Sequence, residues 1–331
     1  MSCVLVTGGT GCIGAVVVRD LLAYGVDQIV VATRSSDPGR LRLWLGEDLD
    51  DRIHFRTADV GDQAATAALV QDCQPTHVIH LGALQSPDCA RDPDLGMRIN
   101  VGGTQALLEA CEQLARPLER FVFASSAAVY GPRSMYPGPI VTESDPLVPP
   151  NRYGVWKLAG EHMARLFHGR TGVPTVCLRL NSTYGPGRDQ GMTSAPTTAL
   201  KSIARGSVRG EVVPFRMPYR GRENYHYVED VGAHFARVAV DPFSGFDAFN
   251  IRGLTIEVTE FLETVANVAG EMGLGRSVDL GVADDATENL FVSDLDHARV
   301  VERFPRVPQT GLKEGIERSL RRFIELEGDG A

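Results

Sequence analysis

The sequence contains no long apolar run. No window approaches the roughly 20 consecutive apolar residues that a transmembrane helix needs. The opening stretch, Met1-Ser2-Cys3-Val4-Leu5-Val6-Thr7, carries no basic residue ahead of an apolar core, and a secretory signal peptide combines both features. We therefore expect a soluble protein without a signal peptide and without a membrane partner.

The chain also lacks basic clusters and cysteine pairs. Its formal net charge is −9 and its pI about 5.4, and no Lys/Arg run is present that could follow a phosphate backbone, so nucleic acid is not an expected partner. The six cysteines are scattered without a CxxC pair. That pattern speaks against a disulfide framework and favours a reducing cytoplasm. We expect no bound metal.

What is present is an alternation of short apolar segments with helical patterns. Apolar runs between helices are typical of strands covered on both faces, hence of a parallel sheet, and right-handed crossovers then give a Rossmann-type doubly wound α/β fold. The expected strands are Val4–Thr7, Gln28–Thr33, Ile53–Thr57, His77–Leu81, Arg120–Ser125, Thr175–Leu180 and Ala248–Ile251. The expected helices are Ile13–Ala23, Ala64–Gln71, Leu95–Leu114, Tyr153–Phe167, Thr197–Ala204, Val228–Val240, Glu257–Ala269 and Leu312–Leu326.

A glycine-rich turn, Thr7-Gly8-Gly9-Thr10-Gly11-Cys12-Ile13-Gly14, joins the first strand to the first helix. Glycine permits backbone conformations closed to other residues and lets the backbone approach a pyrophosphate, and the helix N-terminus offers free N–H groups and the positive end of a dipole. Dinucleotide binding requires this strand–turn–helix position. The expected contacts are Gly8, Gly11, Cys12, Ile13 and Gly14.

The end of the second strand favours NADP over NAD, which stays possible. An acidic residue there would bind the adenosine 2′-hydroxyl of NAD, but Thr33 is followed by Arg34. A guanidinium fits a 2′-phosphate instead. Arg40 is a possible second contact.

Other strand ends complete the expected cofactor site. Asp59 can accept a hydrogen bond from the adenine amino group, although an aspartate here also suits a helix cap, for which Asp62 is the better candidate. His80 is expected to pack in the core. The remaining expected contacts are Val60, Leu81, Gly82, Ala83 and Leu180.

Tyr153 and Lys157 are four residues apart at the start of a predicted helix, so both lie on one face. A free tyrosine has a pKa near 10, and a nearby ammonium and a charged nicotinamide both favour the phenolate. Tyr153 would then exchange a proton with a substrate hydroxyl or carbonyl during hydride transfer. Ser126, at the end of the fifth strand, can orient the reacting oxygen.

Together these residues resemble the extended short-chain dehydrogenase/reductases, also called the NAD-dependent epimerase/dehydratase family. The resemblance implies that Ser126, Tyr153 and Lys157 form the catalytic triad. It also implies that Asn100 supports the site among the cofactor contacts, and that helices near 97–115 and 153–168 form a homodimer interface. The matching stretches are TGGTGCIG (7–14), HLGA (80–83), MRINVGGTQALLEAC (97–111), FASSAAVYG (123–131), YGVWKLAGE (153–161), LRLNSTYGPG (178–187), RENYHYVEDV (222–231) and FNI (249–251).

Two departures from that family narrow the reaction. Dehydratases of this type carry an Asp-Glu pair after the strand-end hydroxyl, where this chain has Ala127 and Ala128, so water elimination lacks its acid and base. Nucleotide-sugar epimerases use two arginines on the substrate pyrophosphate; Arg222 matches the first, but the region 281–289 is acidic and has no arginine, which makes it a poor place for a diphosphate. Four further arginines are possible anion contacts: Arg179, Arg188, Arg216 and Arg220.

These observations divide the chain and leave three functions open. Residues 1–180 with 224–252 are expected to form the NAD(P)-binding domain, and residues 181–223 with 253–331 a substrate-binding lobe. The favoured function is a dehydrogenase or reductase acting on a secondary alcohol or ketone of a sugar-like small molecule, bound through Ser126, Asn181, Ser182, Thr193, Ser194 and Arg222. The alternatives are a nucleotide-sugar 4-epimerase with tightly bound NAD and a non-catalytic NADP-binding sensor.

Overall fold

The computed structural model describes residues 1–34, 37–289 and 291–329. It contains a seven-stranded sheet with the order β10-β6-β5-β4-β1-β2-β3, and every pairing in it is parallel. This confirms the predicted Rossmann-type doubly wound fold. The strands are β1 (Cys3–Thr7), β2 (Gln28–Thr33), β3 (Ile53–Thr57), β4 (His77–His80), β5 (Arg120–Ser126), β6 (Thr175–Leu180) and β10 (Phe246–Asn250).

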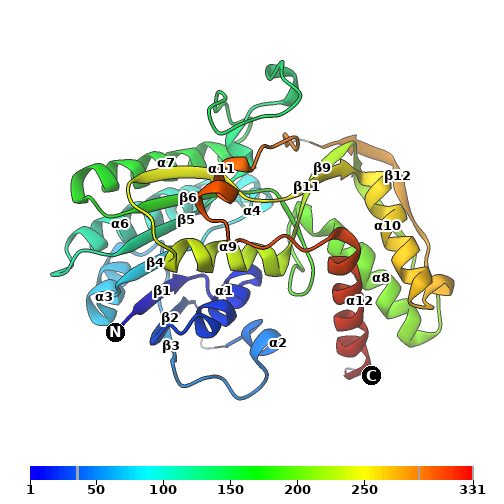
Figure 1. Cartoon of the computed structure of the whole chain (residues 1–331), viewed down its shortest axis with the longest axis horizontal. Coiled ribbons are helices and arrows are strands. Elements are labelled where there is room, and N and C mark those ends of the chain that lie inside the picture. Colours follow the sequence, from blue (N-terminus) through cyan, green and yellow to red (C-terminus); the bar gives the residue numbers. More distant parts are fainter. Residues whose placement is uncertain (35–36, 290, 330–331) are drawn as a thin grey trace.

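Helices cover both faces of this sheet (Figure 1). The side chains of β1 alternate between the faces: Val4 and Val6 pack in one core, and Leu5 packs in the other. All three are fully buried, which explains why the strand is a continuous apolar run. The first core adds α1 (Cys12–Ala23) and α9 (Val228–Val240), and the second adds α3 (Gln63–Cys73), α6 (Thr104–Glu112) and α7 (Arg152–Thr171).

A second body of helices stands beside the sheet, to the right in Figure 1. Its core holds Leu200, Tyr225, Phe261 and Leu320, among other buried residues. Its helices are α8 (Ala195–Arg209), α10 (Val258–Glu271) and α12 (Leu312–Asp329), and its strands are β7 (Ser182–Tyr184), β8 (Phe215–Arg220), β9 (Arg222–Tyr227), β11 (Leu254–Glu257) and β12 (Leu280–Glu288). They form the small sheets β11-β9-β7 and β12-β8.

These five short strands are absent from the sequence prediction. Most of β8 and β12 is exposed or half-buried, so neither strand shows the apolar pattern that identifies a buried strand. Their pairing joins segments about 65 residues apart, and the pairing register shifts between Val282 and Thr287. Short-range patterns carry no information about such a contact.

The predicted helix Leu95–Leu114 is a composite. It consists of α5 (Pro93–Met97), a π-helical turn over Arg98–Gly103, and α6, which ends at Glu112. The π turn brings Gly103 so close to the segment after β3 that a Cβ there would lie 2.8 Å from the Val60 carbonyl oxygen. Three other short helices are α2 (Leu41–Leu45), α4 (Ser86–Arg91) and α11 (Ala298–Arg303).

The chain passes between the two bodies more than once. It leaves the large sheet after β6, builds β7, α8, β8 and β9, and returns for α9 and β10. Val300 and Phe304, beyond the predicted boundary at 252, pack in the core of the large sheet. The predicted division into two domains stays a proposal, and residues 330 and 331 of its second part lie outside the described residues.

No helix in the described residues has the length and apolar character that a membrane crossing demands.

Candidate active site

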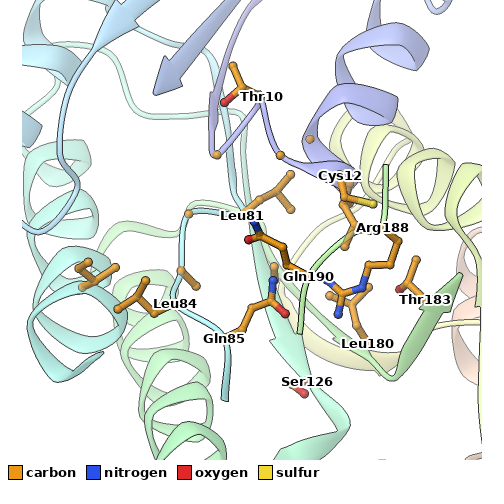
Figure 2. A pocket seen from close by; sticks show the side chains of 18 of the residues that line it. Thr10, Cys12, Leu81, Leu84, Gln85, Ser126, Leu180, Thr183, Arg188 and Gln190 are labelled. Carbon is orange, nitrogen blue, oxygen red and sulfur yellow. The ribbon is translucent and has the colours of Figure 1, made fainter. Parts of the chain in front are cut away.

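A cavity of about 700 Å³ opens at the carboxyl edge of the large sheet. The strand order reverses between β1 and β4, and open α/β sheets bind ligands at such a point. The segments that follow β1, β2, β3 and β4 line the cavity together with the ends of β5 and β6. The loop that follows β7 forms the facing wall and places Arg188 and Gln190 opposite Leu81 and Gln85 (Figure 2).

The glycine turn has no room for side chains. Gly8 has a φ of +70°, a conformation that favours glycine. A Cβ at Gly14 would lie 2.3 Å from the Gly8 carbonyl oxygen. Gly11 caps α1 without a side-chain hydrogen bond, so the first N–H groups of the helix face the cavity uncapped, as an anion site requires. The turn therefore fits the pyrophosphate of a dinucleotide.

The strand-end residues that the sequence predicts as cofactor contacts line this cavity, with one exception. Arg34 lies at its rim, after β2, and is exposed. Arg40 also lines it but forms an ion pair with Asp189, 3.3 Å away. Asp59 accepts from the Gly61 N–H (2.9 Å) and pairs with Arg98 at 3.3 Å. The predicted contacts in the lining are Gly8, Gly11, Cys12, Ile13, Gly14, Arg34, Asp59, Val60, Leu81, Gly82, Ala83, Tyr153, Lys157 and Leu180.

The exception is Asn100, which is buried in the π-helical turn. Its Oδ1 accepts from the Leu84 N–H (2.8 Å), and its Nδ2 donates to the Leu84 carbonyl (3.0 Å). Asn100 thus clamps the backbone of the loop that lines the cavity after β4. That placement agrees with a supporting role and not with direct contact to the cofactor.

The predicted catalytic side chains meet in the cavity. Asn151 caps α7 by accepting from the Gly154 N–H. A Cβ at Gly154 would lie 2.1 Å from the Ala128 carbonyl oxygen, so the start of α7 packs directly on the turn after β5. This contact brings Tyr153 and Lys157 beside Ser126, and all three line the cavity. The Lys157 Nζ donates to the Ala124 carbonyl (2.7 Å) and lies 5.7 Å from the centre of the Tyr153 ring.

Burial dominates the ionisation of both groups. It raises the pKa of Tyr153 to about 12, against the lowering effects of Ser126 and Arg188. Burial lowers the pKa of Lys157 to about 8. The sequence predicts that the lysine ammonium and a charged nicotinamide favour the phenolate, whereas Arg188 is the cation that lowers the Tyr153 pKa in the chain alone.

A buried ion pair lies behind the carboxyl ends of β5 and β6. Arg179 in β6 donates from Nε and Nη2 to the two carboxylate oxygens of Glu161 in α7, at 2.9 and 2.8 Å. Ser125 donates to the same carboxylate at 2.5 Å, and the Arg179 Nη1 donates to the hydroxyl of Tyr130 at 2.8 Å. Glu161 and Arg179 are each less than 5% exposed. The network ties β5, β6 and α7 together directly below Ser126 and Lys157.

The predicted substrate residues are divided between the cavity and its surroundings. Ser126, Asn181 and Thr193 line it. Ser182 is fully buried outside the lining. Arg222 also lies outside it, where its Nε donates to Asp294 at 2.9 Å. Ser194 is not in the lining either, and its hydroxyl donates to the Gly191 carbonyl.

The four arginines that the sequence singles out as possible anion contacts have different surroundings. Arg179 is buried against Glu161, Arg216 pairs with Asp279 at 2.8 Å, and Arg220 pairs with Glu288 at 2.8 Å. Only Arg188 of these four lines the cavity. Sequence reasoning missed other lining residues, among them Thr10, Gln85, Thr183, Gln190 and Phe291. Thr10 lies in the glycine turn and Thr183 in β7, whereas Gln85, Gln190 and Phe291 lie in irregular segments outside the matching stretches.

A buried carboxyl group lies in β9, outside the cavity lining. Glu223 in β9 is 1% exposed and accepts from the Asn224 N–H (3.1 Å) and from Asn289 Nδ2 (2.9 Å). Burial raises the pKa of Glu223 to about 7. His80 is also buried, hydrogen-bonded to Thr7 and Thr104, and burial lowers its pKa to about 3. The neutral core role that the sequence suggests for His80 agrees with this arrangement.

Comparison with known proteins identifies related enzymes. The model of the NAD dependent epimerase/dehydratase family matches residues 4–251. D-erythronate dehydrogenase of Cupriavidus necator is 35% identical over 62% of this chain and 61% of its own. UDP-glucose 4-epimerase of Mycolicibacterium smegmatis is 29% identical over 96% of this chain and 97% of its own. Among solved structures, the UDP-glucose 4-epimerase of Thermus thermophilus in complex with NAD is 28% identical, with a TM-score of 0.77 over 97% of this chain and 98% of that one.

Proposed function

Because the chain belongs to the NAD-dependent epimerase/dehydratase family, we propose that it transfers hydride between a nicotinamide dinucleotide and a secondary alcohol or ketone of a sugar-like small molecule. The convergence of Ser126, Tyr153 and Lys157 on the cavity that the glycine turn enters carries this proposal. The turn and the strand ends would hold the dinucleotide, which supplies the hydride-accepting ring when bound.

The residues have separable roles in alcohol oxidation. Ser126 donates a hydrogen bond to the substrate oxygen and orients it. Tyr153, as the phenolate, takes the hydroxyl proton, and in the reverse direction it returns the proton to the carbonyl. Lys157 keeps its Nζ beside the phenol ring through its bond to the Ala124 carbonyl. The required lowering of the Tyr153 pKa comes from the positive charges that surround the phenol in the loaded site.

The positions that would supply the acid and the base of a dehydratase hold alanines in this chain. Water elimination needs an acid and a base beside the strand-end hydroxyl, and the corresponding residues, Ala127 and Ala128, have no ionisable side chain and are buried. The similarity to a D-erythronate dehydrogenase supports the choice of a dehydrogenase.

The second candidate is a nucleotide-sugar 4-epimerase with tightly bound NAD. The similarity to UDP-glucose 4-epimerases over nearly the whole chain favours it. Against it, Arg222 is paired with Asp294 outside the cavity. The segment where the second pyrophosphate arginine would fall is the strand β12, whose Glu288 pairs with Arg220.

The decisive experiment compares cofactor content with turnover. A dehydrogenase releases its cofactor in each cycle, so we expect the purified protein to be largely cofactor-free. We also expect it to reduce added NADP or NAD when it is given polyols or sugar acids such as D-erythronate. An epimerase would instead carry NAD and convert UDP-glucose without added cofactor.

Tyr153→Phe should lower turnover by about 10²- to 10⁴-fold and leave the dissociation constant of NADP unchanged. The matched control is Tyr24→Phe, since Tyr24 lies at the end of α1 outside the cavity. A variant that retained full activity would refute the proton-transfer role. Cofactor binding without turnover of any substrate by the unmodified protein would favour the sensor.

We propose NADP as the preferred cofactor, with Arg34 as the ligand of the 2′-phosphate. The solved epimerase from Thermus thermophilus contains NAD, so the preference rests on Arg34 at the cavity rim. Arg34→Asp should shift the ratio of the NADP and NAD dissociation constants towards NAD. Arg56→Asp, a charge reversal at an exposed position of β3 outside the cavity lining, is the matched control. Equal shifts in both variants would show that Arg34 contributes only general charge.

We further propose a homodimer formed through α7 and its neighbour α6. Val155 and Leu166 in α7 are apolar but 48% and 55% exposed. Leu166→Glu should lower the sedimentation coefficient from that of a dimer to that of a monomer in analytical ultracentrifugation.

All six cysteines are free, which supports the proposed reducing cytoplasm.

A further inference from the structure

The cavity contains a cation, Arg188, that forms no ion pair with a carboxylate of the described residues. Arg188 is partly buried in the loop after β7, and its Nη2 donates to the Thr193 hydroxyl at 2.6 Å. Its Nε is buried and has no hydrogen-bond partner among the residues that the structure describes. Within residues 1–34, 37–289 and 291–329, no Asp or Glu forms an ion pair with it. The adjacent carboxylate, Asp189, is instead engaged by Arg40 and Lys201.

A partly buried guanidinium with an unpaired N–H is costly for the folded chain, because the lost hydration of that N–H is not replaced. A guanidinium offers a planar fork of N–H donors that matches the two oxygens of a carboxylate or a phosphate. The free donors of Arg188 are therefore arranged for an oxyanion.

The position of Arg188 relates this anion site to the reacting centre. Arg188 lines the same cavity as Leu180, Thr183 and Ser126, and all four are labelled in Figure 2. The charge of Arg188 also lowers the pKa of Tyr153, so the two groups are within electrostatic reach of each other. A small molecule bound between them can place one end on Arg188 and a hydroxyl on Tyr153.

We propose that Arg188 binds the carboxylate of the substrate, and that the substrate is a sugar-like hydroxy acid. This inference rests on the proposed dehydrogenase function. The cavity must also accommodate the dinucleotide, so the space left beside Ser126 suits a short acid. Thr183 and Thr193, which also line the cavity, are available to bind hydroxyl groups of the substrate.

The oxyanion has a second possible source, the pyrophosphate of the cofactor. The charge of Arg188 acts on Cys12 in the glycine turn as well as on Tyr153. The test must therefore measure substrate and cofactor separately.

The substrate arm compares acids with neutral polyols of the same length. Arg188→Gln should raise the KM for aldonates of three to six carbons about tenfold to a hundredfold, as expected for the loss of a charge-assisted hydrogen bond. The variant should keep the same KM for the polyols and the same dissociation constant of NADP. The dependence of kcat on chain length should also stay the same, both among the aldonates and among the polyols. Arg188→Lys should restore part of the loss. Arg216→Gln, a neutralised arginine outside the cavity, is the matched control.

A binding arm separates this proposal from the proposed function. Aldonates are titrated calorimetrically into Tyr153→Phe saturated with NADP, with and without Arg188→Gln, so no turnover is needed. Tighter binding of acids than of polyols that is lost with Arg188→Gln supports the carboxylate site even in a chain that turns over none of them. Equal binding of acids and polyols, or no binding of any acid, overturns it. A weaker affinity for NADP with unchanged aldonate binding overturns it in favour of the pyrophosphate.

Discussion

The buried carboxyl group of Glu223 makes the stability of the fold depend on pH in a predictable way. The pKa of Glu223 is about 7 in the folded chain, whereas an exposed glutamate, as in the unfolded chain, has a pKa of 4.5. The difference is about 2.5 pH units. Each unit corresponds to about 1.4 kcal/mol, so the ionised group opposes folding by about 3 kcal/mol. A raised carboxyl pKa means that the folded chain binds the proton more tightly. The stabilisation is therefore complete below pH 4.5 and is lost as the pH rises through 7.

Glu223→Gln removes this titration and keeps the shape of the side chain. In the unmodified protein Asn289 Nδ2 donates to Glu223. The amide nitrogen of the variant places a second donor opposite Asn289 Nδ2, and this lowers the stability of the variant by an amount that does not depend on pH. Relative to the unmodified protein, the variant should gain about 2.5 kcal/mol between pH 5 and pH 8. At about 2 °C per kcal/mol this is a change of roughly 5 °C in the difference between the two melting temperatures.

The assay is thermal unfolding of both proteins at several pH values between 5 and 8. Glu263→Gln, on the exposed face of α10, is the control and should differ from the unmodified protein by a constant amount. A Glu223→Gln difference that stays constant over this range would refute the reasoning, because it would mean that the carboxyl group titrates alike in the folded and unfolded chains.

Three further predictions concern the site and its support. Gly14→Ala should abolish binding of NADP in a fluorescence titration, because its Cβ would lie 2.3 Å from the Gly8 carbonyl oxygen; unchanged affinity would show that the turn is not the pyrophosphate site. Arg179→Met leaves the carboxylate of Glu161 buried without its cation and should lower the free energy of unfolding by about 3–5 kcal/mol, and the double variant with Glu161→Leu should recover much of it. Arg222→Ala should change the substrate KM less than twofold, because Arg222 lies outside the cavity; a tenfold increase would instead favour a nucleotide-sugar substrate.

The sequence predicts those parts of the site that depend on neighbours along the chain. The glycine turn, Arg34 and Ser126 each follow a strand whose apolar run marks it, and the parallel sheet then brings the strand ends to one edge. Tyr153 and Lys157 need only the geometry of one helix turn. These residues line one cavity in the structure.

The rest depends on contacts between distant segments. The proposed role of Arg188 depends on its lacking a carboxylate partner among the described residues. Arg216 and Arg220 instead pair with Asp279 and Glu288, more than 60 residues away. The pKa of Tyr153 depends on the burial of its hydroxyl, which no local pattern reports. The segment 185–191 includes three glycines with positive φ, and its Asp189 forms ion pairs with Arg40, about 150 residues away, and with Lys201.

β10 is translated well after β6, its partner in the sheet, and this delay has a consequence for synthesis on the ribosome. β6 pairs with β5 on one side, and its other side stays open until β10 joins it. Roughly 65 residues separate the end of β6 from the start of β10, which at about 5–20 residues per second corresponds to roughly 3 to 13 seconds of translation. During that interval the apolar edge of β6 is a template for pairing with another nascent chain. Slow translation between residues 180 and 246 should therefore increase aggregation of the newly made protein.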